Sequence, residues 1–241
     1  MRSYRKDIVW RMRRLIDWFD RGDSAKAERV QFNVETFLDR EFIDYYGMDK
    51  KGRDKKCLLK TMKVGCDVLD KLGVSYWVSR GTLLGWYRGN DFLPGELDID
   101  IDVHTERYVF DIIRHMPFDL LLITNHQQSG HFTQVAFLDR ETDVIFDLFF
   151  YHDEENAIVS PLNPGRFVLP ETILGKLTTM RIGLREYPVP DPEWYCDYWY
   201  GSNWRVPDRY RVEDWVEAYK RSCRGFQHQI GNTTKRLIYF K

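Results

Sequence analysis

The spacing of apolar residues divides this chain into two parts. Residues 5–46 show the spacing of amphipathic helices, with a break at residues 22–24, and a polar linker follows over residues 50–56. The apolar positions of the first helix are Ile8, Met12, Leu15, Ile16 and Phe19. The pattern predicts an N-terminal helical segment over residues 1–56 and a second domain over residues 57–241.

The second part mixes helices with strands. Helical periodicity covers residues 58–72 and 108–116, and Pro117 ends the second of these helices. Runs that are rich in β-branched, aromatic or alternating apolar residues predict strands at residues 74–79, 96–102, 120–124, 131–138 and 144–151. We expect the last two strands to form a hairpin, because only a short polar turn separates them.

The predicted strand at residues 96–102 carries a carboxylate at every second position: Glu96, Asp98, Asp100 and Asp102. Side chains alternate faces along a strand, so these four groups project from one side while Leu97, Ile99 and Ile101 face a core. Neighbours on such a face lie roughly 7 Å apart, where like charges repel. The motif alone leaves two interpretations open: a site for a hard divalent cation, or a solvated acidic face.

Asp147 interrupts the apolar run from Val144 to Tyr151, which is typical of a strand covered on both faces. An ionised carboxylate in such a place is costly unless it is paired or ligates a metal. A structural aspartate bonded to arginine or backbone amides is the alternative. Two acidic strands together favour a metal-dependent phosphoryl-transfer site, because two metal ions at such a site share carboxylate ligands.

A turn, Arg80-Gly81-Thr82, lies between the strand at residues 74–79 and a short predicted helix at residues 83–88. Gly81 permits close backbone approach, and we expect Thr82 to cap the helix, whose free amides would face phosphate oxygens. Taken alone, a Gly-Thr pair before a helix is most often an ordinary cap.

Several segments together resemble the family of LicD phosphocholine transferases, fukutin and fukutin-related protein. The segments that carry this resemblance are Ser79 to Arg88, Phe92-Leu93-Pro94, Leu97 to Asp100, Asp143 to Tyr151, Val189-Pro190 and Tyr200 to Trp204. The resemblance covers about residues 74 to 215, and the wording of the Gly-Trp-Tyr-Arg and Asp-Leu-Phe-Phe-Tyr motifs is closest to fukutin.

The resemblance implies an α+β fold, namely a nucleotidyltransferase-like mixed β-sheet flanked by helices. It also implies transfer of a phosphorylated alcohol, ribitol phosphate or phosphocholine, from a CDP-linked donor to a sugar hydroxyl of a glycan with Mg²⁺ or Mn²⁺. By position, Asp98, Asp100 and Asp147 would hold the metal and act in catalysis. Gly81 and Thr82 would lie beside the donor phosphates, and Arg88 is a further candidate phosphate contact.

Glu96 falls where some relatives have another acidic residue. Asp102 goes beyond the paired aspartates, and a solvated side chain is the simple interpretation of it. Two alternatives to phospho-alcohol transfer stay open. One is a nucleotidyltransferase that attaches a nucleoside monophosphate to a small molecule, and the other is a non-catalytic partner that binds a glycan.

Composition is consistent with a compact enzyme, since the 241 residues are 43% hydrophobic and 15% aromatic. The 36 basic and 37 acidic residues balance, which gives no basic footprint for nucleic acid. No apolar run approaches the roughly 20 residues of a membrane span, and the start lacks a signal sequence. We therefore expect a cytoplasmic protein, or a secretory-pathway lumenal one if the chain has been trimmed. The basic N-terminal helix leaves docking on a membrane or acidic partner open, although a solvated face is the simpler interpretation.

The cysteines and histidines suggest no further metal site. The four cysteines, Cys57, Cys66, Cys196 and Cys223, lack Cys-x-x-Cys spacing, so we expect reduced, partly buried thiols. His104, His126, His131 and His152 show no helical metal-ligand spacing, and we interpret each as incidental. Six aromatic residues between Trp194 and Trp204 are expected to close the core over the sheet, with one ring exposed to ligand.

Overall fold

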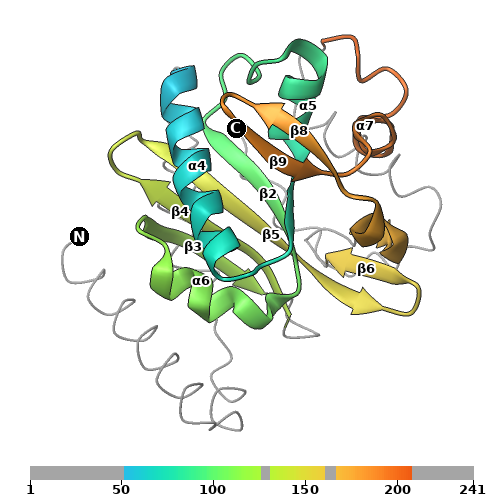
Figure 1. The fold of residues 1–241 in the computed structure, drawn as a ribbon, viewed down its shortest axis with the longest axis horizontal. Coiled ribbons are helices and arrows are strands. Elements are labelled where there is room, and N and C mark those ends of the chain that lie inside the picture. Colours follow the sequence, from blue (N-terminus) through green and yellow to red (C-terminus); the bar gives the residue numbers. More distant parts are fainter. Residues whose placement is uncertain (1–51, 126–130, 161–166, 208–241) are drawn as a thin grey trace, which may run out of the picture. The chain divides into compact units, whose positions relative to one another are not determined.

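The computed structural model describes residues 52–125, 131–160 and 167–207 of the chain (Figure 1). These residues belong to one compact unit, Phe37–Lys241. The predicted N-terminal segment lies outside the described residues except at its last few positions, and the domain division at residue 56 stays a prediction. Cys223 and His126 also lie outside them.

A mixed sheet forms the centre of the described fold. Along its main path the strand order is β1-β2-β5-β4-β3, in which β2 and β5 are parallel and the other neighbours are antiparallel. These strands are β1 (Tyr76–Val78), β2 (Asp98–His104), β5 (Val144–Glu154), β4 (Phe132–Asp139) and β3 (Asp119–Asn125). The sequence-predicted hairpin between β4 and β5 is confirmed, as is the α+β fold class.

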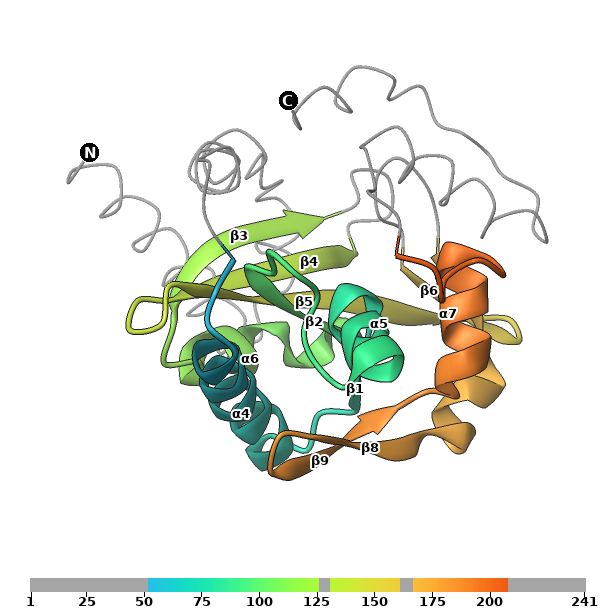
Figure 2. The same ribbon diagram turned by 90° about the horizontal axis from the view of Figure 1, so that it is seen from above.

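Helices α4 (Lys55–Lys71) and α6 (Val109–His115) lie on the same side of this sheet (Figure 2). The packing of α4 is close, because a Cβ added at Gly65 would lie 2.5 Å from the ring of Phe146 on β5. Helix α5 (Arg80–Gly89) follows β1 directly and contacts both β2 and α7 (Pro192–Tyr200). None of the helices in the described ranges is long and apolar enough to cross a bilayer.

The end of β5 continues into a smaller group of elements. Strand β6 (Ala157–Ser160) pairs with β5 and with β7 (Phe167–Pro170), and a 3₁₀ segment η3 (Glu171–Lys176) follows. A separate hairpin, β8 (Thr178–Ile182) and β9 (Arg185–Val189), then leads into α7.

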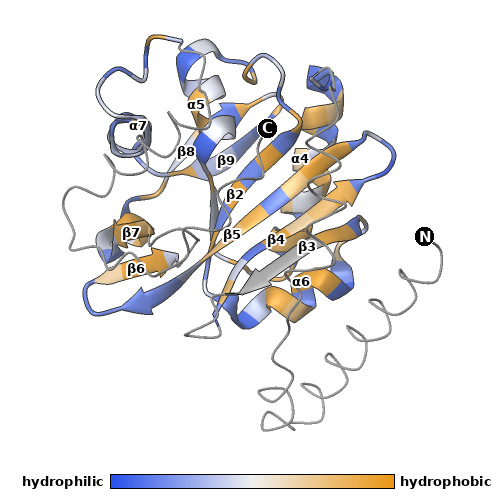
Figure 3. Ribbon diagram, turned by 180° about the vertical axis from the view of Figure 1, so that it is seen from behind, coloured by the Kyte–Doolittle hydropathy of each residue, from blue (hydrophilic) through white to orange (hydrophobic). Residues whose placement is uncertain are grey.

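The hydropathy of the strands indicates which of them face two environments. In Figure 3, β2 alternates between hydrophilic and hydrophobic segments, whereas β4 and β5 are mostly hydrophobic. Ile99, Ile101 and Val103 of β2 are fully buried, as expected for its apolar face. Strand β2 therefore presents a regular row of polar groups from within the core sheet.

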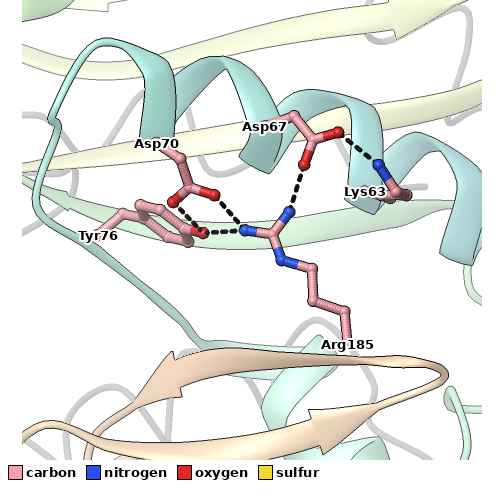
Figure 4. Close-up of polar contacts among 5 residues, drawn as sticks. All are labelled: Lys63, Asp67, Asp70, Tyr76 and Arg185. Atoms are coloured by element: carbon pink, nitrogen blue, oxygen red, sulfur yellow. Dashed lines mark hydrogen bonds and ion pairs between the residues drawn. The ribbon is translucent and has the colours of Figure 1, made fainter.

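An ion-pair cluster fastens the β8–β9 hairpin to α4 (Figure 4). Arg185 of β9 donates from Nη1 to Asp67 Oδ1 at 2.6 Å, and from Nη2 to Asp70 and to the Tyr76 hydroxyl. Lys63 donates to the other oxygen of Asp67 at 2.6 Å. We call these five residues the Arg185 cluster. Each of its two carboxylates has a cationic partner within the protein.

Candidate active site

Three carboxylates from two strands converge on the face of the sheet opposite the buried apolar side chains of β2. In the parallel pairing of β2 with β5, Asp100 lies directly opposite Asp147. One carboxylate oxygen from each of Asp98, Asp100 and Asp147 lies within 4.8 Å of the other two. The structure thus brings together the three residues that the sequence analysis selected, and we call them the carboxylate centre.

The two carboxylate oxygens of Asp147 differ in their hydrogen bonding within the described fold. Gln134 of β4 donates from Nε2 to its Oδ2 at 2.7 Å. Its Oδ1 is buried and has no hydrogen-bond partner among the described residues. Asp147 is only 3% exposed, so water does not readily substitute for the missing partner. A cation bound at the carboxylate centre would satisfy this oxygen.

Asp100 is oriented by the start of helix α5. Its Oδ2 accepts hydrogen bonds from the backbone N–H of Gly81 at 3.0 Å and of Thr82 at 3.4 Å. A Cβ at position 81 would lie 3.1 Å from that oxygen and 3.3 Å from Oε2 of Glu96. The expected close approach at Gly81 is therefore an approach to carboxylates of the site. Contact of Gly81 and Thr82 with a donor phosphate stays a prediction.

The expectation that Thr82 caps the helix is wrong. Helix α5 begins at Arg80, and Ser79 occupies the N-cap position. The Thr82 hydroxyl instead accepts a hydrogen bond from the backbone N–H of Asp100 at 2.9 Å. Thr82 thus joins α5 to β2 by a reciprocal pair of contacts, which fixes the helix start against the acidic strand.

The electrostatics of the carboxylate centre favour an added cation. Burial, together with the negative charge of Asp98, raises the pKa of Asp100 to about 8. Burial and the charges of Asp100 and Asp98 raise the pKa of Asp147 well above its ordinary value, and burial with Asp98 does the same for Glu96. The donor set consists of carboxylate oxygens, which are the ligands that Mg²⁺ and Mn²⁺ prefer. The residues present therefore fit such an ion.

Asp102 has a different environment, and the interpretation of it as a solvated side chain is wrong. It is fully buried, its Oδ1 accepts from Nε of Arg80 at 3.3 Å, and its Oδ2 accepts from the Tyr195 hydroxyl at 2.7 Å. The Arg80 guanidinium carbon lies 3.4 Å from the centroid of the Phe149 ring. Asp102 thus pairs with a buried cation directly beside the carboxylate centre.

Arg80 holds this position with an unusual backbone. Its φ of +46° lies in the left-handed region, which costs a non-glycine residue on the order of 1–3 kcal/mol. Its contacts with Asp102, Phe149 and Trp199 hold the conformation in place. The sequence analysis missed Arg80 and Tyr195 as parts of the site, although both lie in segments that it singled out.

Arg88 lies at the other end of α5, seven residues after Gly81 and roughly 10 Å along the helix axis. Its Nη2 donates to the backbone oxygen of Trp204. This contact joins the end of α5 to the turn after α7. A phosphate contact of Arg88 stays a prediction, and its observed partner is a structural one.

The aromatic segment closes the core as expected. Tyr195, Trp199 and Trp204 are buried, whereas Trp194 is 38% exposed and stacks on Tyr198 with ring centroids 5.5 Å apart. Cys57, Cys66 and Cys196 are free thiols, and the last two are buried. Burial raises the pKa of Cys196 to about 12, so this thiol is inert at neutral pH.

Comparison with known proteins identifies the family of this sequence. Residues 73–192 match the family model described as LicD/FKTN/FKRP, nucleotidyltransferase domain. The chain belongs to the LicD family. Ribitol-5-phosphate transferase FKTN from Homo sapiens is 25% identical over 172 residues, which cover 68% of this chain and 36% of that relative. The Mus musculus protein of the same name is 22% identical over 191 residues, covering 77% and 39%. The chain thus spans little more than a third of these curated relatives.

Two solved structures are also similar. The antibiotic-resistance factor ANT(2'')-Ia is 17% identical with a TM-score of 0.39, covering 69% of this chain and 82% of that one. A nucleotidyltransferase-like protein from Paracoccidioides brasiliensis is 16% identical with a TM-score of 0.40, covering 78% and 86%.

Proposed function

We propose that this LicD-family protein is a metal-dependent phosphotransferase. It would move a phosphorylated alcohol, of the ribitol phosphate or phosphocholine type, from a CDP-linked donor to a sugar hydroxyl of a glycan. The observation that carries the proposal is the convergence of Asp98, Asp100 and Asp147 within 4.8 Å, with a buried oxygen of Asp147 left unpartnered in the described fold. The curated relatives, named ribitol-5-phosphate transferases, support the class of cargo.

Asp98, Asp100 and Asp147 would hold the Mg²⁺ or Mn²⁺. An ion held there would supply positive charge beside a donor diphosphate. Glu96 lies close to this group, because burial and the charge of Asp98 raise its pKa, and a Cβ at Gly81 would lie 3.3 Å from its Oε2. The protein supplies four acidic groups here, and a dianionic donor would bind to them only through a cation.

The chain's own residues pre-organise the carboxylates. Gln134 fixes one oxygen of Asp147, and the amides of Gly81 and Thr82 fix one oxygen of Asp100. Each carboxylate therefore keeps its orientation without reorganisation when donor binds, which is where most electrostatic catalysis originates. Arg80 adds a buried positive charge whose position is set by Asp102.

We assign acceptor orientation to Asp147. Its Oδ1 has more than one lone pair, so the same oxygen could ligate the ion and accept a hydrogen bond from a sugar hydroxyl. Removal of the hydroxyl proton by Asp147 would accompany attack of the hydroxyl oxygen on the donor phosphorus. The bond between that phosphorus and the bridging oxygen would break, and cytidine monophosphate would leave with the electron pair.

The test is product analysis with purified full chain, CDP-ribitol or CDP-choline, a glycan acceptor and Mg²⁺ or Mn²⁺. Release of cytidine monophosphate with a phospho-alcohol on the acceptor supports the proposal. In a parallel assay with CTP in place of the CDP-alcohol, release of pyrophosphate supports attachment of a nucleoside monophosphate instead. Turnover that survives removal of divalent ions by a chelator contradicts both.

Calorimetry separates these enzymes from a non-catalytic glycan-binding partner. A transferase binds CDP-alcohol more tightly with Mg²⁺ than without it, and this difference disappears in Asp100→Asn. Asp119→Asn is the matched control, since the Asp119 side chain is exposed and forms an ion pair with Arg140 away from the carboxylate centre. Glycan binding with no metal-dependent nucleotide binding would indicate the non-catalytic partner.

A further inference from the structure

A second cluster of potential metal ligands lies away from the carboxylate centre. It consists of Glu106, in the 3₁₀ segment η2 (Glu106–Tyr108), His131, just before β4, and His152 on β5. One ligand atom of each lies within 4.8 Å of the other two. The sequence analysis interpreted both histidines as incidental, because they are far apart in the chain and no local spacing links them.

Strand pairing brings the two histidines together. The antiparallel register of β4 with β5 places Gln134 opposite Phe149, and continuing it by three residues places His131 opposite His152. Their rings stack with centroids 4.1 Å apart. The β2–β5 pairing also places Glu106 beside the two histidines. The backbone N–H of Thr105 donates to the Tyr151 oxygen at 2.8 Å, so η2 begins next to β5.

The backbone of Phe132 orients two of the ligand groups, His152 and Glu106. His152 donates from Nε2 to the Phe132 oxygen at 3.0 Å, so its Nδ1 carries the lone pair and faces Oε1 of Glu106 at 3.8 Å. The Phe132 N–H donates to Oε2 of Glu106, and Oε1 contacts Nδ1 of His131 at 2.6 Å. Metal-binding histidines commonly have such a carbonyl partner at the second ring nitrogen.

The position and chemistry of this cluster differ from those of the carboxylate centre. His152 follows Asp147 by five residues on β5, roughly 16 Å along the strand, and the odd residue count puts the two side chains on opposite faces. Burial lowers the pKa of His152 from its ordinary value, which favours the neutral imidazole that can ligate a metal. Two imidazole nitrogens and one carboxylate suit zinc and similar ions better than Mg²⁺.

We propose that Glu106, His131 and His152 bind a divalent transition-metal ion of the zinc class, separately from the metal of the carboxylate centre. Three protein ligands leave one position of a tetrahedral ion for water or another ligand. His131 lies at the solvent-accessible edge, with 46% of its side chain exposed, and offers a path of entry. The ion would link the segment after β2, the start of β4 and the end of β5 at one point.

The test is metal titration of the full chain after chelator treatment, with excess Mg²⁺ present to saturate the carboxylate centre. Zn²⁺ should bind with one-to-one stoichiometry, and Co²⁺ in its place should give the intense visible absorption of a four-coordinate ion. His131→Ala should weaken Zn²⁺ binding by about 100-fold or more and abolish the Co²⁺ signal, because it removes one of three ligands. Glu106→Gln should weaken binding in the same direction.

Two variants serve as controls. His104→Ala removes a nearby histidine that contacts Asp153 instead, and it should leave Zn²⁺ affinity unchanged. Asp100→Asn should also retain it, since this residue belongs to the carboxylate centre. Circular dichroism shows whether each variant is folded before titration. Equal Zn²⁺ affinity in the wild-type protein and His131→Ala, or loss of binding in Asp100→Asn, would overturn the proposal.

Discussion

The Arg185 cluster and the carboxylate centre both contain aspartates, but the hydrogen-bond donors to those aspartates differ in charge. In the first, a single guanidinium reaches Asp67 and Asp70 together, and Lys63 supplies a second cation (Figure 4). In the second, the hydrogen bonds that Asp100 and Asp147 accept within the described ranges come from neutral groups, namely backbone amides and the Gln134 side chain.

The pKa shifts express the same contrast. Burial acts to raise the pKa of Asp67, but the hydrogen bond from Lys63 and the charges of Lys63 and Arg185 outweigh it and lower the pKa. At the carboxylate centre burial and neighbouring aspartates raise the pKa values of Asp100 and Asp147. The aspartates of the Arg185 cluster thus have cationic partners within the protein, whereas burial and neighbouring carboxylates disfavour the charged forms of Asp100 and Asp147.

Asp147→Asn provides the strongest test of this contrast. We expect transfer activity to fall by about a thousand-fold or more, because the change removes a metal ligand and the group that orients the acceptor. The thermal stability of the metal-free protein should hold or rise, since one of three repelling charges disappears. Activity assays and calorimetric melting of the same preparation measure both effects.

Asp119→Asn is the control for that variant, and it should change neither quantity appreciably. A melting temperature that drops sharply in metal-free Asp147→Asn would mean that this carboxylate has a structural partner, as the aspartates of the Arg185 cluster do.

Arg185→Ala should act on stability and leave the chemistry alone. It removes the shared partner of two carboxylates and the contact with the Tyr76 hydroxyl, so we expect a loss of roughly 1–3 kcal/mol in the free energy of unfolding. Urea denaturation measures this loss. Arg181→Ala on the same hairpin changes an exposed residue and should fall within about 0.5 kcal/mol of the wild type.

The metal-free protein should become less stable as the pH rises from about 5 to about 8. The pKa of Asp100 is about 8 in the folded state, against an ordinary value of 3.8, so between these values the folded state binds more protons than the unfolded state. The contribution reaches at most about 1.4 kcal/mol per pH unit. Melting temperatures in chelator across this range should show it.

Two additions sharpen the pH experiment. Asp100→Asn should flatten the profile, and Mg²⁺ should raise stability most at the alkaline end, where protons compete least for the carboxylates. Asp67 has a lowered pKa, so its stabilising contribution is lost only as the pH falls below its ordinary value of 3.8. A melting temperature that does not change with pH in the metal-free wild type would contradict the electrostatic difference between the carboxylate centre and the Arg185 cluster.

Lys63→Ala should have the smallest effect, because the pair with Asp67 is an exposed contact between residues four apart on one helix. Such pairs contribute about 0.5 kcal/mol or less. Urea denaturation alongside Arg185→Ala would show whether Arg185 carries most of the stabilisation in the cluster. An effect of Lys63→Ala equal to that of Arg185→Ala would contradict this ranking.

Local pattern and the family resemblance together predicted the carboxylate centre. The period-two spacing of Asp98 and Asp100, with Ile99 between them, determines which side chains share a face, and Asp147 stood out against an apolar run. The acidic strand alone left a solvated face open, and the resemblance added the fold class and the metal-binding role of the three aspartates. The parallel pairing of β2 with β5 brings Asp98, Asp100 and Asp147 together in space. The spacing of residues along each strand is consistent with this pairing but does not determine it.

The residues missed at the sequence level depend on long-range contacts. Asp102 follows the same spacing as Asp100, yet it is buried because Arg80 and Tyr195 cover it, and Tyr195 lies 93 residues further along the chain. Likewise, His131 and His152 become neighbours only through strand register. The wrong cap assignment of Thr82 arose because Arg80, a non-glycine residue, adopts a positive φ and starts the helix earlier.

The direct opposition of Asp100 and Asp147 has a consequence for how this protein matures. Slippage of either strand by a single residue would turn one of the two aspartates toward the helices and bury it among apolar side chains. A misaligned sheet would thus carry the cost of burying a carboxylate among apolar groups, with or without a ligand. The register that places Asp100 opposite Asp147 is therefore the one that keeps both carboxylates off the apolar face of the sheet.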